Sequence, residues 1–172
     1  MSTRVQINRH RRDAGQAMVE FALVVVFIFL LFVGILQIIL LMHAYNTLAD
    51  AAKEGVRYAI VHGTGAGAAS CSGPGTVPNV NPAVSCTDGT GANVVNAVAN
   101  FAGMSFQNIA TSAIVVSYDP NSANTNNPAF GKKCSQAGCM VGVTVSYQYT
   151  PLFGFSWPSF TLNAAASGTI AN

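Results

Sequence analysis

The chain has 172 residues, of which only 8% are charged and 51% are hydrophobic. Soluble proteins carry roughly 25% charged residues, so this composition excludes an ordinary cytosolic enzyme and indicates a membrane segment or an unusually uncharged surface. The net charge of +2 is also unevenly placed, because four arginines, Arg4, Arg9, Arg11 and Arg12, precede a long apolar run. The remainder has almost no basic face to neutralise phosphates, which excludes a nucleic acid as partner.

The apolar run extends from residue 21 to residue 42, with Gln37 as its one amide. About 22 residues at 1.5 Å each are enough to cross a hydrocarbon core of about 30 Å. A cleavable signal peptide is the competing interpretation, but its apolar core spans only about 7–15 residues. We therefore expect residues 16–42 to form one retained transmembrane helix. The arginines before it predict a cytoplasmic N-terminus and an extracytoplasmic C-terminal part.

The helical pattern continues outside the membrane over residues 43–62. Apolar side chains recur there at three- and four-residue spacing, which predicts one apolar stripe along the helix. The stripe comprises Tyr45, Leu48, Ala49, Ala52, Val56, Ala59 and Ile60. On the other side, Asp50 is spaced to pair with Lys53, and Glu54 with Arg57. The stripe requires another part of the fold to cover it.

Residues 63–172 are expected to form an extracytoplasmic head. The segment 63–93 is rich in Gly, Ser, Pro and Asn and is typical of a long loop, whereas 92–102 has the pattern of a short helix. Alternating apolar residues predict three strands, at 112–118, 140–149 and 160–170. The expected fold class is α+β, in which the extended helix packs against a small antiparallel sheet with a short helix and long loops.

All four cysteines, Cys71, Cys86, Cys134 and Cys139, lie in the head. An oxidising compartment favours disulfides over free thiols, and four cysteines allow three pairings. Their spacings, fourteen and four intervening residues, do not form the paired knuckles of a zinc site. We expect the pairs Cys71–Cys86 and Cys134–Cys139, because each closes the shorter loop within its own segment.

The head has no set of residues suited to catalysis. It contains no histidine beyond His62, and its two carboxylates, Asp88 and Asp119, stand in separate turns. A serine or cysteine nucleophile would therefore lack a base, and isolated aspartates are a poor acid–base pair. We expect no enzymatic activity, no catalytic residue, no metal site and no cofactor.

Glu20 is the one carboxylate at the entrance to the apolar run. An unpaired carboxylate in hydrocarbon costs at least about 2.5–3.5 kcal/mol. One explanation is that Glu20 lies near enough to the interface to reach lipid headgroups. The other is that a partner molecule supplies an opposite charge.

The segment Gly15, Gln16, Ala17–Val19, Glu20 and Phe21, followed by the apolar helix, resembles a type IV prepilin-type leader. More narrowly, GQAMVEFALVVV together with LADAAKEGVRYA (48–59) resembles the TadE-like family of minor, pilin-like proteins from tight-adherence (Tad) pili. Its members often read GQALVEFAL, then a membrane span, then an AAREGARYA-type segment. The resemblance covers about residues 14–60. TadF-like and TadG-like proteins share the leader and stay open as alternatives.

The resemblance implies a cytoplasmic leader, residues 1–15, that a prepilin peptidase removes between Gly15 and Gln16. Glu20 then becomes the fifth residue of the mature chain, beside Phe21, and its carboxylate meets the terminal amine of a neighbouring subunit. The implied partners are the peptidase, the major pilin, other minor pilins, the pilus assembly platform and the membrane. The implied location is the inner membrane, as a single-pass protein, or the pilus itself.

The function expected on this basis is that of a minor pilin or pilus assembly subunit, with a structural or priming role in filament biogenesis and surface adhesion. The alternative is a membrane-anchored protein whose outer domain binds a ligand or wall polymer without entering a filament. Cleavage after Gly15 distinguishes the two, because only the pilin requires it.

Overall fold

The structure is a computed structural model that describes residues 4–75, 82–104, 108–119, 135–151 and 159–171. The side chains of residues 4–14 and of Asp119 are not described. The chain forms two compact units, Met1–Leu41 and Met42–Asn172. One helix, α1 (Arg4–Val61), contributes to both units.

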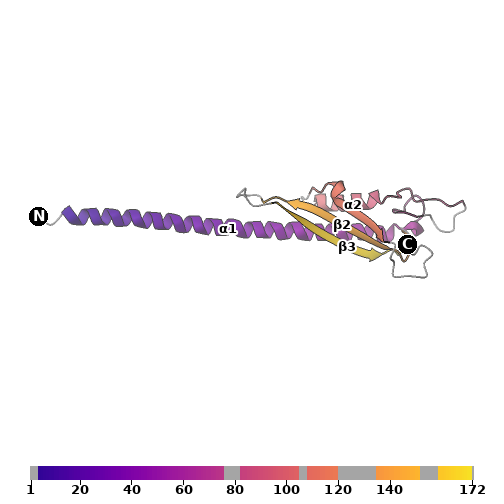
Figure 1. Cartoon of the computed structure of the whole chain (residues 1–172), viewed down its shortest axis with the longest axis horizontal. Coiled ribbons are helices and arrows are strands. Elements are labelled where there is room, and N and C mark those ends of the chain that lie inside the picture. Colours follow the sequence, from indigo (N-terminus) through magenta and orange to yellow (C-terminus); the bar gives the residue numbers. More distant parts are fainter. Residues whose placement is uncertain (1–3, 76–81, 105–107, 120–134, 152–158, 172) are drawn as a thin grey trace. The chain divides into compact units, whose positions relative to one another are not determined.

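The first unit is the N-terminal part of helix α1, which runs from Arg4 to Val61 (Figure 1). The helix begins earlier than residue 16, because no proline interrupts the preceding segment. Its part from Gly15 to Val61 is long and apolar enough to cross a membrane. The large apolar side chains from Met18 to Phe32 are 45% to 77% exposed. Such a surface is suited to lipid or to another apolar partner rather than to water.

The second unit contains a three-stranded antiparallel sheet in the order β1-β2-β3 (Figure 1). The strands are β1 (Ile114–Asp119), β2 (Met140–Tyr149) and β3 (Phe160–Thr169). All ten residues of β2 pair with β3 in one uninterrupted register, from Met140 opposite Thr169 to Tyr149 opposite Phe160. The expected meander is confirmed. β1 starts two residues later than expected because a 3-10 turn, Thr111–Ala113, occupies the segment before it.

The short helix is also confirmed, as α2 (Ala92–Met104). It buries Val94, Val98 and Ala102 at four-residue spacing, which is one face of a helix. The rest of the segment 63–93 is irregular apart from a 3-10 turn, Thr64–Ala66, and one isolated bridge, Ser72 opposite Asp88.

One hydrophobic core joins the sheet, α2 and the part of α1 that belongs to the second unit. From β2, alternate residues Val141, Val143 and Val145 are fully buried, so the inner face of the sheet follows the predicted alternation. The other buried members are Leu48, Ala51, Ala52, Val56, Ala59, Val94, Val98, Ala102, Ile109, Ile114, Tyr118, Cys139, Ala164 and Ile170. The helix face with Leu48 and Val56 thus packs against the sheet, as expected.

The predicted stripe on α1 is wrong at one position. Tyr45 is 46% exposed, whereas the small residues Ala44, Ala51 and Gly55 are buried. Gly55 shows the reason, because a Cβ atom there would collide with Cγ2 of Val98 on α2. Close approach of the helices selects small residues at their contact, and a pattern of large apolar residues does not reveal this.

The two expected ion pairs of α1 are confirmed. Nζ of Lys53 lies 3.0 Å from Oδ1 of Asp50, and Nη1 of Arg57 lies 3.8 Å from Oε2 of Glu54. Both pairs are largely exposed, so each contributes only a few tenths of a kcal/mol to the helix.

The structure contains the expected Cys71–Cys86 disulfide, with 5.3 Å between the two Cα atoms. Cys139 is also disulfide-bonded. Its expected partner, Cys134, lies outside the described residues, so the pairing of Cys134 with Cys139 stays a prediction.

Candidate functional site

The residues expected to carry processing and assembly lie together on α1. Gly15, Gln16, Glu20 and Phe21 all belong to this helix, and all four are exposed. A Cβ atom at Gly15 would meet no other atom within 4 Å. Among the described residues, no atom therefore packs against Gly15 where a side chain would lie.

Glu20 is exposed on α1. No hydrogen bond or ion pair to it is formed among the described residues. Gln16 and Glu20 are four residues apart in one helix, so their side chains share a face. A chain cut after Gly15 would hold a new amino group and this carboxylate one helical turn apart, both on the exposed surface of α1.

Asp88 organises the second polar site, in the loops that precede α2. Its carboxylate accepts hydrogen bonds from the hydroxyls of Ser72 and Thr90 and from the backbone N–H groups of Ala92, at 2.8 Å, and Asn93, at 2.7 Å. The last two belong to the first turn of α2, whose N–H groups have no partner within the helix. Asp88 therefore caps α2 and joins it to the segment that contains Ser72.

These hydrogen bonds favour the ionised form of Asp88. Partial burial by itself raises the pKa of a carboxyl group, but the donors from Ser72, Asn93, Ala92 and Thr90 outweigh it and lower the pKa of Asp88 below its ordinary value. The negative charge also lies at the N-terminal end of α2, where the helix dipole favours it. Asp88 is ionised at neutral pH and stabilises the fold in that form.

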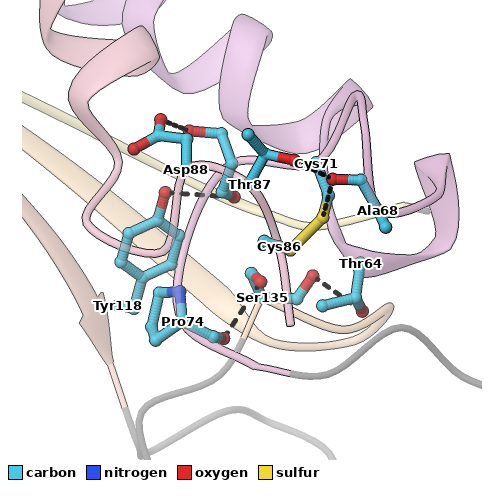
Figure 2. The surroundings of a disulfide bond; sticks show 10 residues. Thr64, Ala68, Cys71, Pro74, Cys86, Thr87, Asp88, Tyr118 and Ser135 are labelled. Atoms are coloured by element: carbon cyan, nitrogen blue, oxygen red, sulfur yellow. Dashed lines mark hydrogen bonds between the residues drawn. A yellow bond between two sulfur atoms is a disulfide. The ribbon is translucent and has the colours of Figure 1, made fainter. Parts of the chain in front are cut away.

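Tyr118 lies next to this cap, on the inner face of β1, and is only 7% exposed. Its hydroxyl donates to the carbonyl oxygen of Ser72 at 3.4 Å (Figure 2). Burial raises the pKa of Tyr118 to about 12, the Ser72 side chain opposes this shift, and the Asp88 charge reinforces it. Gly73 and Gly91 approach its ring at positive φ, where a Cβ atom would come within 2.6 Å and 3.0 Å of Tyr118 atoms.

The Cys71–Cys86 disulfide lies in the same loop region as Asp88. Next to it, Thr87 donates through its backbone N–H and its hydroxyl to the carbonyl oxygen of Ala68, at 3.0 Å and 2.7 Å. The hydroxyl of Ser135 donates to the carbonyl of Pro74 at 3.0 Å, and the N–H of Thr64 donates to the carbonyl of Ser135 at 2.8 Å. These contacts tie the end of α1 to the loops around the disulfide (Figure 2).

The polar groups around Asp88 stabilise the fold. Among the described residues, no group of three or more His, Cys, Asp or Glu side chains could hold a metal ion. The Asp88 oxygens are already bonded to donors of the fold. Neither His43 nor His62 is within the Asp88 cluster, and the Nδ1 atom of His62 bonds to the carbonyl of Tyr58 at 2.9 Å.

Sequence reasoning placed Gly15, Gln16, Glu20 and Phe21 on one helix but assigned Asp88 only to a turn. The signal that could have found its role is an Asp followed by glycine just before a helical pattern, which is typical of an N-terminal cap. The contact with Ser72 had no local signal, because it joins residues sixteen positions apart.

The comparisons with known proteins concern the N-terminal segment. Residues 15–57 match the family model described as "TadE-like protein", which confirms the resemblance of this segment to the TadE-like family. The match contains both the Gly15–Phe21 segment and the ion pairs of α1. No curated protein and no solved structure gives a significant match.

Proposed function

We propose, from the TadE-like sequence of residues 15–57, that this chain is a minor pilin or pilus assembly subunit. The family suggests a protein associated with tight-adherence pili, which act as structural assemblies rather than as enzymes. The observation that carries the proposal is the exposed Glu20 on an apolar helix, five positions after Gly15 and without an ion pair among the described residues. In this role residues 1–15 are a cytoplasmic leader, 16–42 span the inner membrane and 43–172 lie outside it.

A prepilin peptidase cuts between Gly15 and Gln16 in this proposal, and the cut supplies a new terminal amine. A carboxylate that is costly alone in hydrocarbon becomes tolerable when an amine of a neighbouring subunit pairs with it. The exposed apolar side chains around Glu20 allow such a neighbour to approach. The favoured partners are the major pilin and other minor pilins, because they carry the same kind of N-terminal helix.

The first test of this function is the mature N-terminus. N-terminal mass spectrometry of the membrane form is expected to find chains that begin at Gln16. Gly15→Val is the matched variant, since the space around Gly15 accommodates a side chain. It should insert and fold normally but retain Met1. Wild-type chains that keep Met1 beside an active peptidase would contradict the proposal.

The second test replaces Glu20 by Gln in the only copy of the protein. The amide is neutral and costs less in hydrocarbon, so the variant should reach normal membrane levels and be cleaved after Gly15. Surface filaments, counted by electron microscopy, should decrease because the charge pairing is lost. Glu20→Asp, which keeps the charge, is the control and should retain more filaments. Unchanged filament number in Glu20→Gln would leave the headgroup explanation for Glu20.

A further inference from the structure

The part of α1 in the second unit has an outward face opposite the hydrophobic core. Its residues recur at three- and four-residue spacing and are exposed, except for a half-buried Glu54: Met42, His43, Asn46, Asp50, Lys53, Glu54, Arg57 and Val61. Four of them, Asp50, Lys53, Glu54 and Arg57, form what we call the charged strip. The side chains of Lys53 and Arg57 are 70% and 79% exposed.

The strip is unusual within this chain because charge is scarce elsewhere in the second unit. Strands β2 and β3 contain no charged residue. After Tyr58 the sequence has only Asp88, Asp119, Lys132 and Lys133. Charged residues therefore do not cover the surface of the second unit in general. Exposed ion pairs between residues three apart also add little to a helix, so stability does not explain the strip.

The order of the charges along the strip is negative, positive, negative, positive. Two parallel helices in the same register would place each charge opposite an identical one. A displacement by three residues, about 4.5 Å along the axis, places Asp50 of one helix opposite Lys53 of the next. The same displacement places Glu54 opposite Arg57. A displacement by four residues brings like charges together again.

An antiparallel pair would also match the charges, but membrane insertion excludes it. Two copies anchored by the same N-terminal helix have the same orientation, so their outer segments run parallel. This step rests on the membrane topology of the proposed function. The charge order and the orientation together select the displaced parallel arrangement.

We propose that the charged strip binds the charged strip of a second copy of this chain, displaced along the helix axis by about three residues. Such a contact is heterologous, because one copy offers its Asp50 and Glu54 while the other offers its Lys53 and Arg57. A heterologous contact with an axial displacement does not close on itself and can accept a further copy at each end. The strip is therefore an interface for repeated side-by-side addition.

The test uses two full-length variants with complementary strips, in membranes solubilised with mild detergent. The basic variant carries Asp50→Lys and Glu54→Lys, and the acidic variant carries Lys53→Glu and Arg57→Glu. Two differently tagged copies of one chain are expressed together, and co-purification measures their association. Each variant alone should lose association relative to wild type, whereas the basic and acidic variants together should recover it.

A third variant keeps the alternation but inverts it, with Asp50→Lys, Lys53→Asp, Glu54→Lys and Arg57→Glu. It carries the most substitutions yet should associate like wild type, which separates charge order from damage to the helix. Association of wild type should also weaken at 1 M salt, where charges are screened beyond about 3 Å. Near-ultraviolet circular dichroism checks that each variant is folded.

Recovery only in the mixed and inverted variants supports the proposal. Absence of association in wild type, undiminished association of one single-sign variant, or failure of the mixture overturns it. The mature N-terminus is read from the same samples. Chains that keep Met1 but associate through the strip would contradict the proposed pilin function and leave this interface intact.

Discussion

The contact of Gly55 with α2 predicts whether Gly55→Ala raises or lowers the free energy of unfolding. Gly55 lies inside α1, and alanine is favoured over glycine in a helix interior by about 1 kcal/mol. A Cβ atom at this position, however, collides with Cγ2 of Val98 and also lies 3.4 Å from Cγ1 of Val143. Overpacking of a core typically costs about 1–3 kcal/mol. Gly55→Ala should therefore lower the free energy of unfolding by up to about 2 kcal/mol.

Gly103 provides the matched control, because it lies in α2 and a Cβ atom there meets nothing within 4 Å. Gly103→Ala gains the helix propensity without the collision and should stabilise by about 0.5–1 kcal/mol. Both variants gain helix propensity, so their difference mainly reflects the overpacking cost of about 1–3 kcal/mol. In a unit of this size that difference corresponds to roughly 3–5 °C in Tm per kcal/mol.

The assay is thermal unfolding of the full-length protein in detergent, followed by near-ultraviolet circular dichroism. A Val98→Ala background removes the colliding methyl groups, and there Gly55→Ala should become stabilising by about 1 kcal/mol. Coupling of this size is expected only between residues in contact. If Gly55→Ala raised Tm as much as Gly103→Ala does, the close packing of α1 against α2 would be refuted.

Three further outcomes are expected in the head. Replacing Cys71 and Cys86 together by Ser should lower the free energy of unfolding by about 3 kcal/mol, as loop closure over 15 residues implies. A reductant should have no comparable effect on this double variant through the Cys71–Cys86 pair, because the variant lacks that disulfide. The folded state lowers the pKa of Asp88. Its contribution to stability is therefore complete above the ordinary pKa of about 3.9 and is lost as the pH falls through the lower pKa of the folded state. At acidic pH, the free energy of unfolding of Asp88→Ala should change less with pH than that of the wild type. Non-reducing peptide mapping should link Cys139 to Cys134, and a link from Cys139 to Cys71 or Cys86 would overturn the pairing.

The sequence predicted those parts of the fold that depend on local periodicity. β2 was predicted at its observed bounds because apolar residues alternate along it, and Val141, Val143 and Val145 on its inner face are fully buried. Helix α2 and the buried side of α1 followed from three- and four-residue spacing in the same way. The start of β1 was misplaced because Thr111–Ala113 turns in a 3-10 conformation before the strand begins.

What sequence reasoning missed depends on contacts between distant segments. Tyr45 fits an apolar stripe by hydrophobicity, yet Gly55 and Ala51 are the residues that the closely packed helix buries. Asp88 was recognised as a turn residue, while its bonds to Ser72 and to the first turn of α2 exist only once the loops have folded. The role of Glu20 comes from the family pattern and stays a prediction.

The glycine contacts of α1 also have a mechanical consequence. Gly55 of α1 accommodates Val98 of α2. At Gly168 of β3, a Cβ atom would come within 2.8 Å of both Ile60 and Val56 of α1, so α1 packs closely against the rest of the second unit at two places. A tensile load applied along α1 would have to displace these side chains from the spaces beside the two glycines before the helix could slide past the sheet. Force applied along α1 would thus act on the sheet as shear across several side-chain contacts, which resist together, rather than by breaking one contact after another.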